Sequence, residues 1–135
     1  MHDTLVAFRA ITMNEIGAAY HVIANSKLLP KYLAEILDLP VKSCANPKDC
    51  ELRISLKIES LWILTNLSLL DGFNEKLFRE NNIQEIIQGL ILEHYIEGSM
   101  ANSTKKRTLS EGELSLLDNM LWLTGNLAAD VGYEI

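Results

Sequence analysis

Two tryptophan–asparagine pairs carry the clearest chemical signal in this sequence. Trp62 precedes Asn66 in "WILTN" and Trp122 precedes Asn126 in "WLTGN", so each indole lies four residues before a carboxamide. Four residues are about one helical turn, which places both side chains on one face of a helix. A carboxamide both donates and accepts hydrogen bonds and can hold the backbone of an extended peptide. Indoles can hold the aliphatic parts of Lys or Arg, with a cation–π attraction of roughly 0.5–2 kcal/mol each.

The polar surroundings of both tryptophans predict that the indoles are exposed. Asp118 and Asn119 come before Trp122, and Asn126 and Asp130 follow it at four-residue steps, so these residues share one side of a helix. Asp130 could pair with the ammonium of a bound lysine. The neighbours of Trp62 on its side of the helix are Ser55, Glu59, Thr65 and Asn66, with Ile58 as an apolar exception.

A structural reading of these pairs competes with the binding reading. Each indole could cover the adjacent stretch of helix, and each asparagine could satisfy a backbone group. Because the pair occurs twice, we favour a binding surface. Another side of the last helix is apolar and is expected to pack on neighbouring helices; its residues are Leu117, Met120, Leu121, Leu127 and Ala128.

The elements that must position these residues are helices, since the apolar spacing is helical nearly everywhere and no strict alternation predicts a strand. Helices are predicted over about 4–13, 15–24, 29–39, 50–70, 74–80, 83–96 and 111–129. Ser26 and Pro30 favour the start of the third helix. The polar stretch around 97–112 is predicted to be a loop.

The order of long, short and medium helices recurs along the chain. An alignment of the two halves places Leu28 opposite Ile83, and "LLDNMLWLTGNLAAD" begins a third copy. Repeated helical units that cannot bury their apolar faces alone are typical of an α-solenoid. The number of helices also permits a compact helical bundle, but the repeated order favours the solenoid.

Composition limits the classes of protein to consider. The chain has 135 residues, enough for a single domain with a core, and 48% of them are hydrophobic. Its net charge of −6 disfavours a nucleic-acid partner. No apolar run is long enough to cross a membrane, and the first residues do not resemble a signal peptide.

The remaining reactive residues indicate no enzyme. The spacing of Cys44 and Cys50 fits no zinc motif, and we interpret both as free thiols of a reducing, intracellular compartment. His2, His21 and His94 are scattered without the spacing of metal ligands. No phosphate-binding loop or nucleophile motif occurs. We therefore expect no catalytic residues, no metal and no cofactor.

The chain resembles armadillo-repeat proteins, and within that class the importin-alpha family of nuclear-import adaptors. "ESLWILTN" is similar to that family's "EAAWALTN", and "WLTGNLAAD" to its "WALGNIAGD". The resemblance implies a right-handed solenoid whose concave groove binds basic nuclear-localisation peptides. It implies that Trp62, Asn66, Trp122 and Asn126 form two rungs of a ladder in that groove. Asp130 falls where the family has its lysine-binding aspartate.

The resemblance is good over about 50–130 and rests on the helix pattern alone before that. It implies a single domain over 1–135 with about two and a half repeats: a degenerate repeat at about 1–45, a repeat at about 46–105 with the loop 97–112, and a partial repeat at about 110–135.

The sequence departs from the family in three ways. Trp62 and Trp122 are sixty residues apart rather than about forty, and the surplus falls in the loop. In the repeat that contains Trp62 and Asn66, Leu70 occupies the position that corresponds to Asp130. The first long helix has neither Trp nor Asn at the matching places, which are Ala7 and Ile11 or Phe8 and Thr12.

Two functional hypotheses follow. The first is an adaptor of cytoplasm and nucleus that holds an extended Lys/Arg-rich segment on its Trp/Asn ladder. The second is a structural armadillo scaffold that assembles with itself or with another subunit, without binding cargo. The basic cluster Lys105–Arg107 could itself enter such a groove, although a solvated loop explains it more simply.

Overall fold

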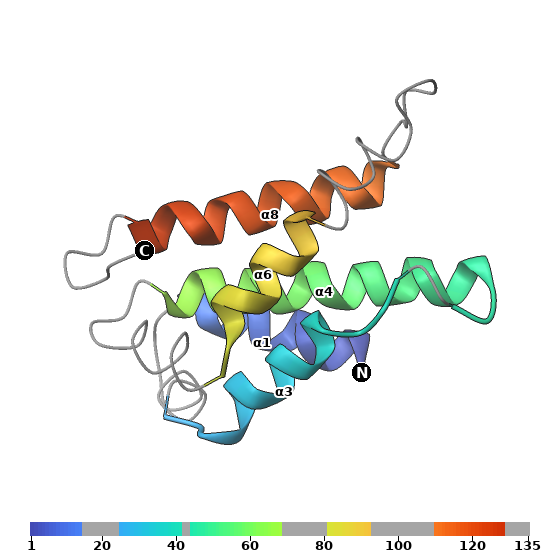
Figure 1. The fold of residues 1–135 in the computed structure, drawn as a ribbon. Coiled ribbons are helices and arrows are strands. Elements are labelled where there is room, and N and C mark those ends of the chain that lie inside the picture. Colours follow the sequence, from blue (N-terminus) through green and yellow to red (C-terminus); the bar gives the residue numbers. More distant parts are fainter. Residues whose placement is uncertain (15–24, 42–43, 69–80, 93–109, 129–135) are drawn as a thin grey trace.

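The computed structural model describes residues 1–14, 25–41, 44–68, 81–92 and 110–128 (Figure 1). Five α-helices lie within these residues: α1 (His2–Asn14), α3 (Leu28–Leu37), α4 (Pro47–Leu67), α6 (Ile83–Ile91) and α8 (Glu111–Ala128). No strand occurs in the described ranges, so the prediction of an all-α chain is confirmed. The helices expected over 15–24 and 74–80, and nearly all of the expected loop over 97–112, lie outside the described residues.

Local capping sets the helix starts. The Oδ1 atom of Asn46 accepts the backbone N–H of Asp49 at 3.0 Å, and Pro47 fills the first turn, so α4 begins three residues before the predicted start. The Oγ atom of Ser26 accepts the N–H of Leu29 at 3.2 Å, as its place upstream of α3 suggested. Ser110 caps α8 in the same way, accepting the N–H of Glu113 at 3.2 Å.

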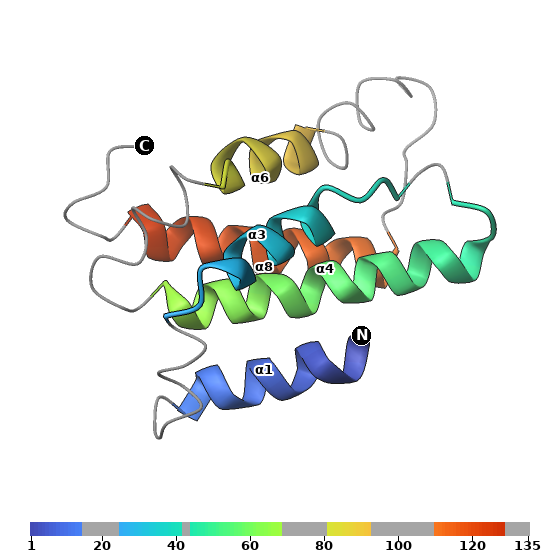
Figure 2. The same cartoon turned by 90° about the horizontal axis from the view of Figure 1, so that it is seen from below.

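The helices form two layers. The three long helices α1, α4 and α8 run in the same direction, with α4 between the other two (Figure 1, Figure 2). The shorter helices α3 and α6 run back the other way on one side of this layer. Helix α3 packs on α4 and α6, while α6 also contacts α8. Each short helix therefore packs on one long helix, α3 on α4 and α6 on α8, and the two short helices pack on each other.

The core lies where α4 meets its neighbours. Four of its apolar side chains are fully buried: Leu61, Ile63, Leu64 and Leu67. Each such burial is worth about 1.5–3 kcal/mol. Lys57 is also fully buried, and its Nζ atom donates to the carbonyl oxygen of Leu37 at the end of α3. The free carbonyls and negative dipole of a helix C-terminus suit a cationic partner.

The two cysteines form a disulfide, so the prediction of free thiols is wrong. The turn through Asn46 and Pro47 into α4 brings Cys44 and Cys50 to a Cα–Cα distance of 5.6 Å. This distance is in the usual range for a disulfide. The bond closes a short loop that enters the first turn of α4.

The buried side of α8 differs from the apolar side that the sequence predicted. Met120 and Leu127 are buried as expected, and Leu117 packs partly against the core. Leu121 is instead 56% exposed, while Leu116 and Leu123 are buried. The side chain of Ala128 lies outside the description. The helix is therefore rotated relative to our expectation, which leaves Leu121 on an outer side.

No helix in the described part of the chain is long and apolar enough to span a membrane.

Candidate peptide-binding site

Both tryptophans lie on the outer side of their helices. The side chain of Trp62 on α4 is 38% exposed, and that of Trp122 on α8 is 61% exposed. The Nη1 atom of Arg53 on α4 donates to the carbonyl oxygen of Pro40 at 2.6 Å. The side of α4 that carries Arg53 therefore faces the chain just after α3. Arg53 lies nine residues, or two and a half turns, before Trp62. Trp62 therefore points away from α3, toward the open face of the long-helix layer.

The asparagines connect neighbouring long helices. The Nδ2 atom of Asn66 donates to the Oγ1 atom of Thr12 at 3.1 Å and to the carbonyl oxygen of Arg9 at 3.4 Å, both on α1. The Nδ2 atom of Asn126 donates to the Oγ atom of Ser68 at 3.2 Å, at the end of α4. Each carboxamide thus reaches back to the preceding long helix. These bonds support a structural role for the two Nδ2 atoms, which hold the preceding helix. The Oδ1 atoms of both asparagines accept no hydrogen bond from the described residues.

The two hydrogen bonds also fix how α1 corresponds to α4. Because Thr12 and Ser68 accept equivalent bonds, the residues of α1 that match Trp62 and Asn66 are Val6 and Ala10. This register differs by one or two residues from both registers expected from the sequence. Helix α1 therefore continues the layer but supplies neither an indole nor a carboxamide.

The polar residues beside Trp62 are less exposed than their types suggested. Thr65 is 7% exposed, and its Oγ1 atom donates to the carbonyl oxygen of Leu61 at 2.7 Å. Glu59 is 8% exposed because α1 covers it. Fewer side chains around Trp62 are therefore exposed than the sequence predicted. The indole of Trp62 itself is the main accessible group.

An ion pair joins α1 and α4 beside the tryptophan. The Nη1 atom of Arg9 lies 3.0 Å from Oε1 of Glu59. The second oxygen of Glu59, Oε2, is buried and has no hydrogen-bond partner among the residues that the structure describes. Sequence reasoning placed Glu59 near Trp62 but missed Arg9. The available signal was that Arg9 is the only Lys or Arg in α1.

Around Trp122 the outcome is mixed. Asp118 is exposed one turn before the indole, as expected. Asn119 is buried, and its Nδ2 atom donates within α8 to the carbonyl oxygen of Ser115 at 2.8 Å. Asp130, the predicted lysine partner, and the cluster Lys105–Arg107 both lie outside the described residues.

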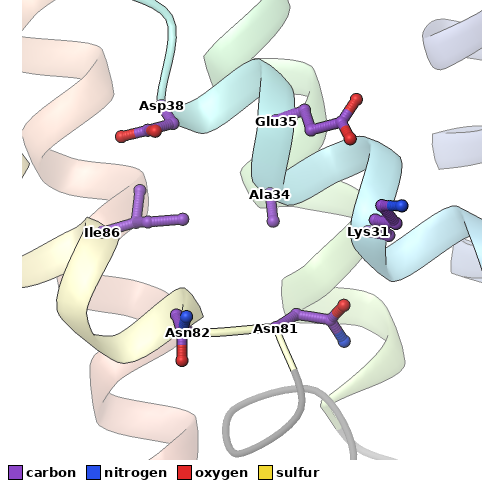
Figure 3. A pocket seen from close by; sticks show the side chains of 7 residues that line it. All are labelled: Lys31, Ala34, Glu35, Asp38, Asn81, Asn82 and Ile86. Carbon is purple, nitrogen blue, oxygen red and sulfur yellow. The ribbon is translucent and has the colours of Figure 1, made fainter.

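A separate groove lies between α3 and α6 (Figure 3). Its volume is about 400 Å³, and it is lined by Lys31, Glu35 and Asp38 from α3 and by Asn81 and Asn82 at the start of α6. Asn82 adopts a left-handed backbone with φ of 54°, which turns the chain into α6. The described lining holds no His, Cys, Ser or Thr, and its charges have both signs. Its two carboxylates belong to no group of three or more potential metal ligands among the described residues.

No group of three or more potential metal ligands occurs in the described part of the chain. Trp62, Asn66, Trp122 and Asn126, which we call the tryptophan face, offer two exposed indoles and the Oδ1 acceptors of the two asparagines, with the carboxylate of Asp118 nearby.

Comparison with known proteins identifies no relative. The chain matches no protein family, no curated protein and no solved structure. The functional argument therefore rests on the geometry of the tryptophan face and on the sequence motifs that form it.

Proposed function

We propose that this chain is a peptide-binding adaptor module with the architecture of a right-handed armadillo-type α-solenoid of about two and a half repeats. Its tryptophan face holds an extended Lys/Arg-rich segment of the nuclear-localisation type. The observation that carries this proposal is the exposure of two indoles at corresponding positions on adjacent, parallel helices. Exposed apolar side chains that gather on one face, unlike those scattered singly, mark interaction surfaces.

The arrangement of the helices supports the repeat architecture. In an up-and-down bundle with short connections, helices adjacent in sequence and space alternate in direction. Here α1, α4 and α8 run parallel, and the chain returns through α3 and α6 on one side of them. A unit that repeats with the same direction generates a stack of equivalent helices. Equivalent indoles then fall on one face of the stack.

The hydrogen bonds of the asparagines are compatible with peptide binding. The amide nitrogens of Asn66 and Asn126 hold the preceding helix, so the side chains are already oriented before a peptide arrives. Their Oδ1 atoms can accept backbone N–H groups of an extended peptide. Preorganised acceptors of this kind reduce the entropy lost on binding.

Charge favours a cationic peptide. The chain carries a net charge of −6, and α8 contains three carboxylates and no Lys, Arg or His. Asp118 is exposed one turn from Trp122 and can attract a Lys or Arg side chain that lies on the indole. Asp130 follows Asn126 by four residues in the sequence. We propose that its carboxylate also binds a Lys or Arg side chain of the peptide.

The test is a titration with a labelled lysine-rich peptide of the nuclear-localisation type, followed by fluorescence anisotropy. Loss of one indole contact of about 0.5–2 kcal/mol should weaken binding by two- to thirtyfold in Trp122→Ala. Asp130→Lys should weaken it further by charge repulsion. Leu28→Ala, which removes a side chain 76% exposed on α3, is the matched control and should bind as the wild type does.

A peptide of the same length with each Lys replaced by Glu controls for nonspecific association. Equal binding of both peptides, or undiminished affinity in a Trp62→Ala/Trp122→Ala double variant with unchanged helical circular dichroism, would refute the proposed site.

A further inference from the structure

A second surface of α8 exposes leucine side chains. Leu114 is 52% exposed and Leu121 is 56% exposed. They are seven residues apart, about two turns, and therefore lie on one side of the helix. Leu117 lies between them and is partly buried at the edge of the core. We call Leu114, Leu117 and Leu121 the leucine face.

The leucine face corresponds to the side of α4 that binds α8. The shift of sixty residues that aligns the two tryptophans also aligns Leu121 with Leu61 and Leu114 with Ile54. Leu61 is fully buried. Ile54 packs partly against the core, and its Cγ2 atom is 3.2 Å from where a Cβ atom of Gly112 would lie. On α4 these positions form a helix-binding surface, and on α8 the matching leucines face outward.

The burial of the two helices supports this correspondence. Five residues of α8 are buried, namely Leu116, Asn119, Met120, Leu123 and Leu127, and each has a buried counterpart on α4. Helix α4 buries further residues whose α8 counterparts are not buried, among them Lys57, Leu61, Leu64 and Thr65. At 100° per residue these four share one side of α4. The two helices therefore differ in burial on one side only: this side is covered on α4, whereas on α8 it is the leucine face and lies open.

Acidic residues flank the leucine face. Glu111 and Asp118 are both exposed, lie seven residues apart, and therefore share one flank of the leucine face, beside Leu114 and Leu121. Helix α8 has no basic residue. A second copy of the chain, with its net charge of −6, would meet repulsion here. An apolar helix side with an acidic flank is complementary to an amphipathic helix with a basic flank.

We propose that the leucine face is a docking surface for an amphipathic helix that carries leucine-like residues in the middle and Lys or Arg on the flank that meets Glu111 and Asp118. The docked helix packs on α8 as α8 packs on α4. The leucines of this surface are distinct from the tryptophan face, because Trp122 lies about 100° further around α8 than Leu121, and Asp118 lies at the border of the two surfaces. The proposal does not depend on peptide binding at the tryptophans.

The probe is a synthetic amphipathic peptide of about three heptads, with Leu at the core positions and Lys at the flanking ones. Its affinity for the full chain is measured by isothermal titration calorimetry. We expect saturable binding that is at least tenfold tighter than that of a peptide with Glu at the flanking positions. Leu114→Ser/Leu121→Ser should weaken binding at least tenfold, and Asp118→Lys should reduce the preference for the Lys peptide several-fold.

Two controls separate this surface from the tryptophan face. A peptide with the same Lys content and a central Pro cannot form the helix and should lose binding to the leucine face. Trp122→Ala should leave binding of the helical peptide unchanged. Leu28→Ser is the matched control for removal of an exposed leucine and should also bind normally.

Three outcomes would overturn the proposal: equal binding of the Lys and Glu peptides, unchanged affinity in Leu114→Ser/Leu121→Ser, or loss of binding in Trp122→Ala alone. Sedimentation velocity of the protein without peptide supplies a fourth outcome. A wild-type dimer that dissociates in Leu114→Ser/Leu121→Ser would assign the leucine face to a second copy of the chain.

Discussion

Replacing Arg9 by Met should destabilise the protein, because Arg9 supplies the partner that the structure gives to a buried carboxylate. Glu59 is 8% exposed, its Oε1 atom lies 3.0 Å from Nη1 of Arg9, and its Oε2 atom has no hydrogen-bond partner in the described part of the chain. Breaking a fully buried ion pair on one side costs about 3–5 kcal/mol. The Arg9 side chain is 37% exposed, so water can replace part of its contact. We therefore expect a loss of about 1–3 kcal/mol.

The assay is urea unfolding followed by circular dichroism, applied to a double-mutant cycle. Arg9→Met leaves the buried carboxylate of Glu59 without its ion-pair partner. Glu59→Met instead removes the buried charge and fills its space with an apolar side chain. Since the double variant contains no unpaired buried charge, it should be more stable than Arg9→Met by about 1 kcal/mol or more.

An Arg9→Met variant within about 0.5 kcal/mol of the wild type would refute this reasoning. So would a double variant in which the two losses simply add, since additivity means that the side chains do not interact. Arg9→Lys provides a milder control that keeps the charge but changes the geometry of the donor.

Three further changes test the fold. Leu61→Ala should lower the free energy of unfolding by about 2–5 kcal/mol, because Leu61 is fully buried. Leu121→Ala, at the matching but exposed position, should lower it by less than about 1 kcal/mol. Equal losses in urea unfolding would contradict the register between α4 and α8. Cys50→Ser should lower the free energy of unfolding by about 2 kcal/mol through loss of the loop closed with Cys44, and the reductant sensitivity of the wild type should vanish in this variant. Asn46→Ala removes the cap of α4 and should cost about 1 kcal/mol, while Asn46→Asp, which keeps an acceptor, should be nearly neutral.

Helix positions were predictable because their signals are local. The apolar spacing predicted every described helix, and Ser26 indicated where α3 begins. Most errors at helix ends were of two or three residues, as with α4, which follows the cap Asn46 and begins at Pro47, three residues before the range expected to be helical. A carboxamide followed by Pro is a start signal that could have been used.

Contacts between distant parts of the chain were not predictable in the same way. The pairing of Arg9 with Glu59 spans fifty residues and depends on the register of α1 against α4, which the sequence left open between two choices. The disulfide depends on the turn between Cys44 and Cys50, and their spacing alone does not reveal it. The exposure of Leu121 depends on a rotation of α8 that apolar spacing defines only loosely, because Leu116, Leu117, Leu121 and Leu123 together surround much of the helix.

The repeated spacing of tryptophan and asparagine has a physical cause besides binding. Because Asn66 and Asn126 both donate to hydroxyls at the end of the preceding long helix, any unit that stacks in this way gains from a carboxamide at that position. The recurrence of asparagine alone therefore does not distinguish a site from a structural repeat. The indoles are the part of the motif that stacking does not explain, since Trp122 gains little from packing while 61% exposed. A stacking role accounts for the asparagine donors, and under our proposal a bound peptide would account for the exposed indoles and for the Oδ1 acceptors, which have no partner among the described residues.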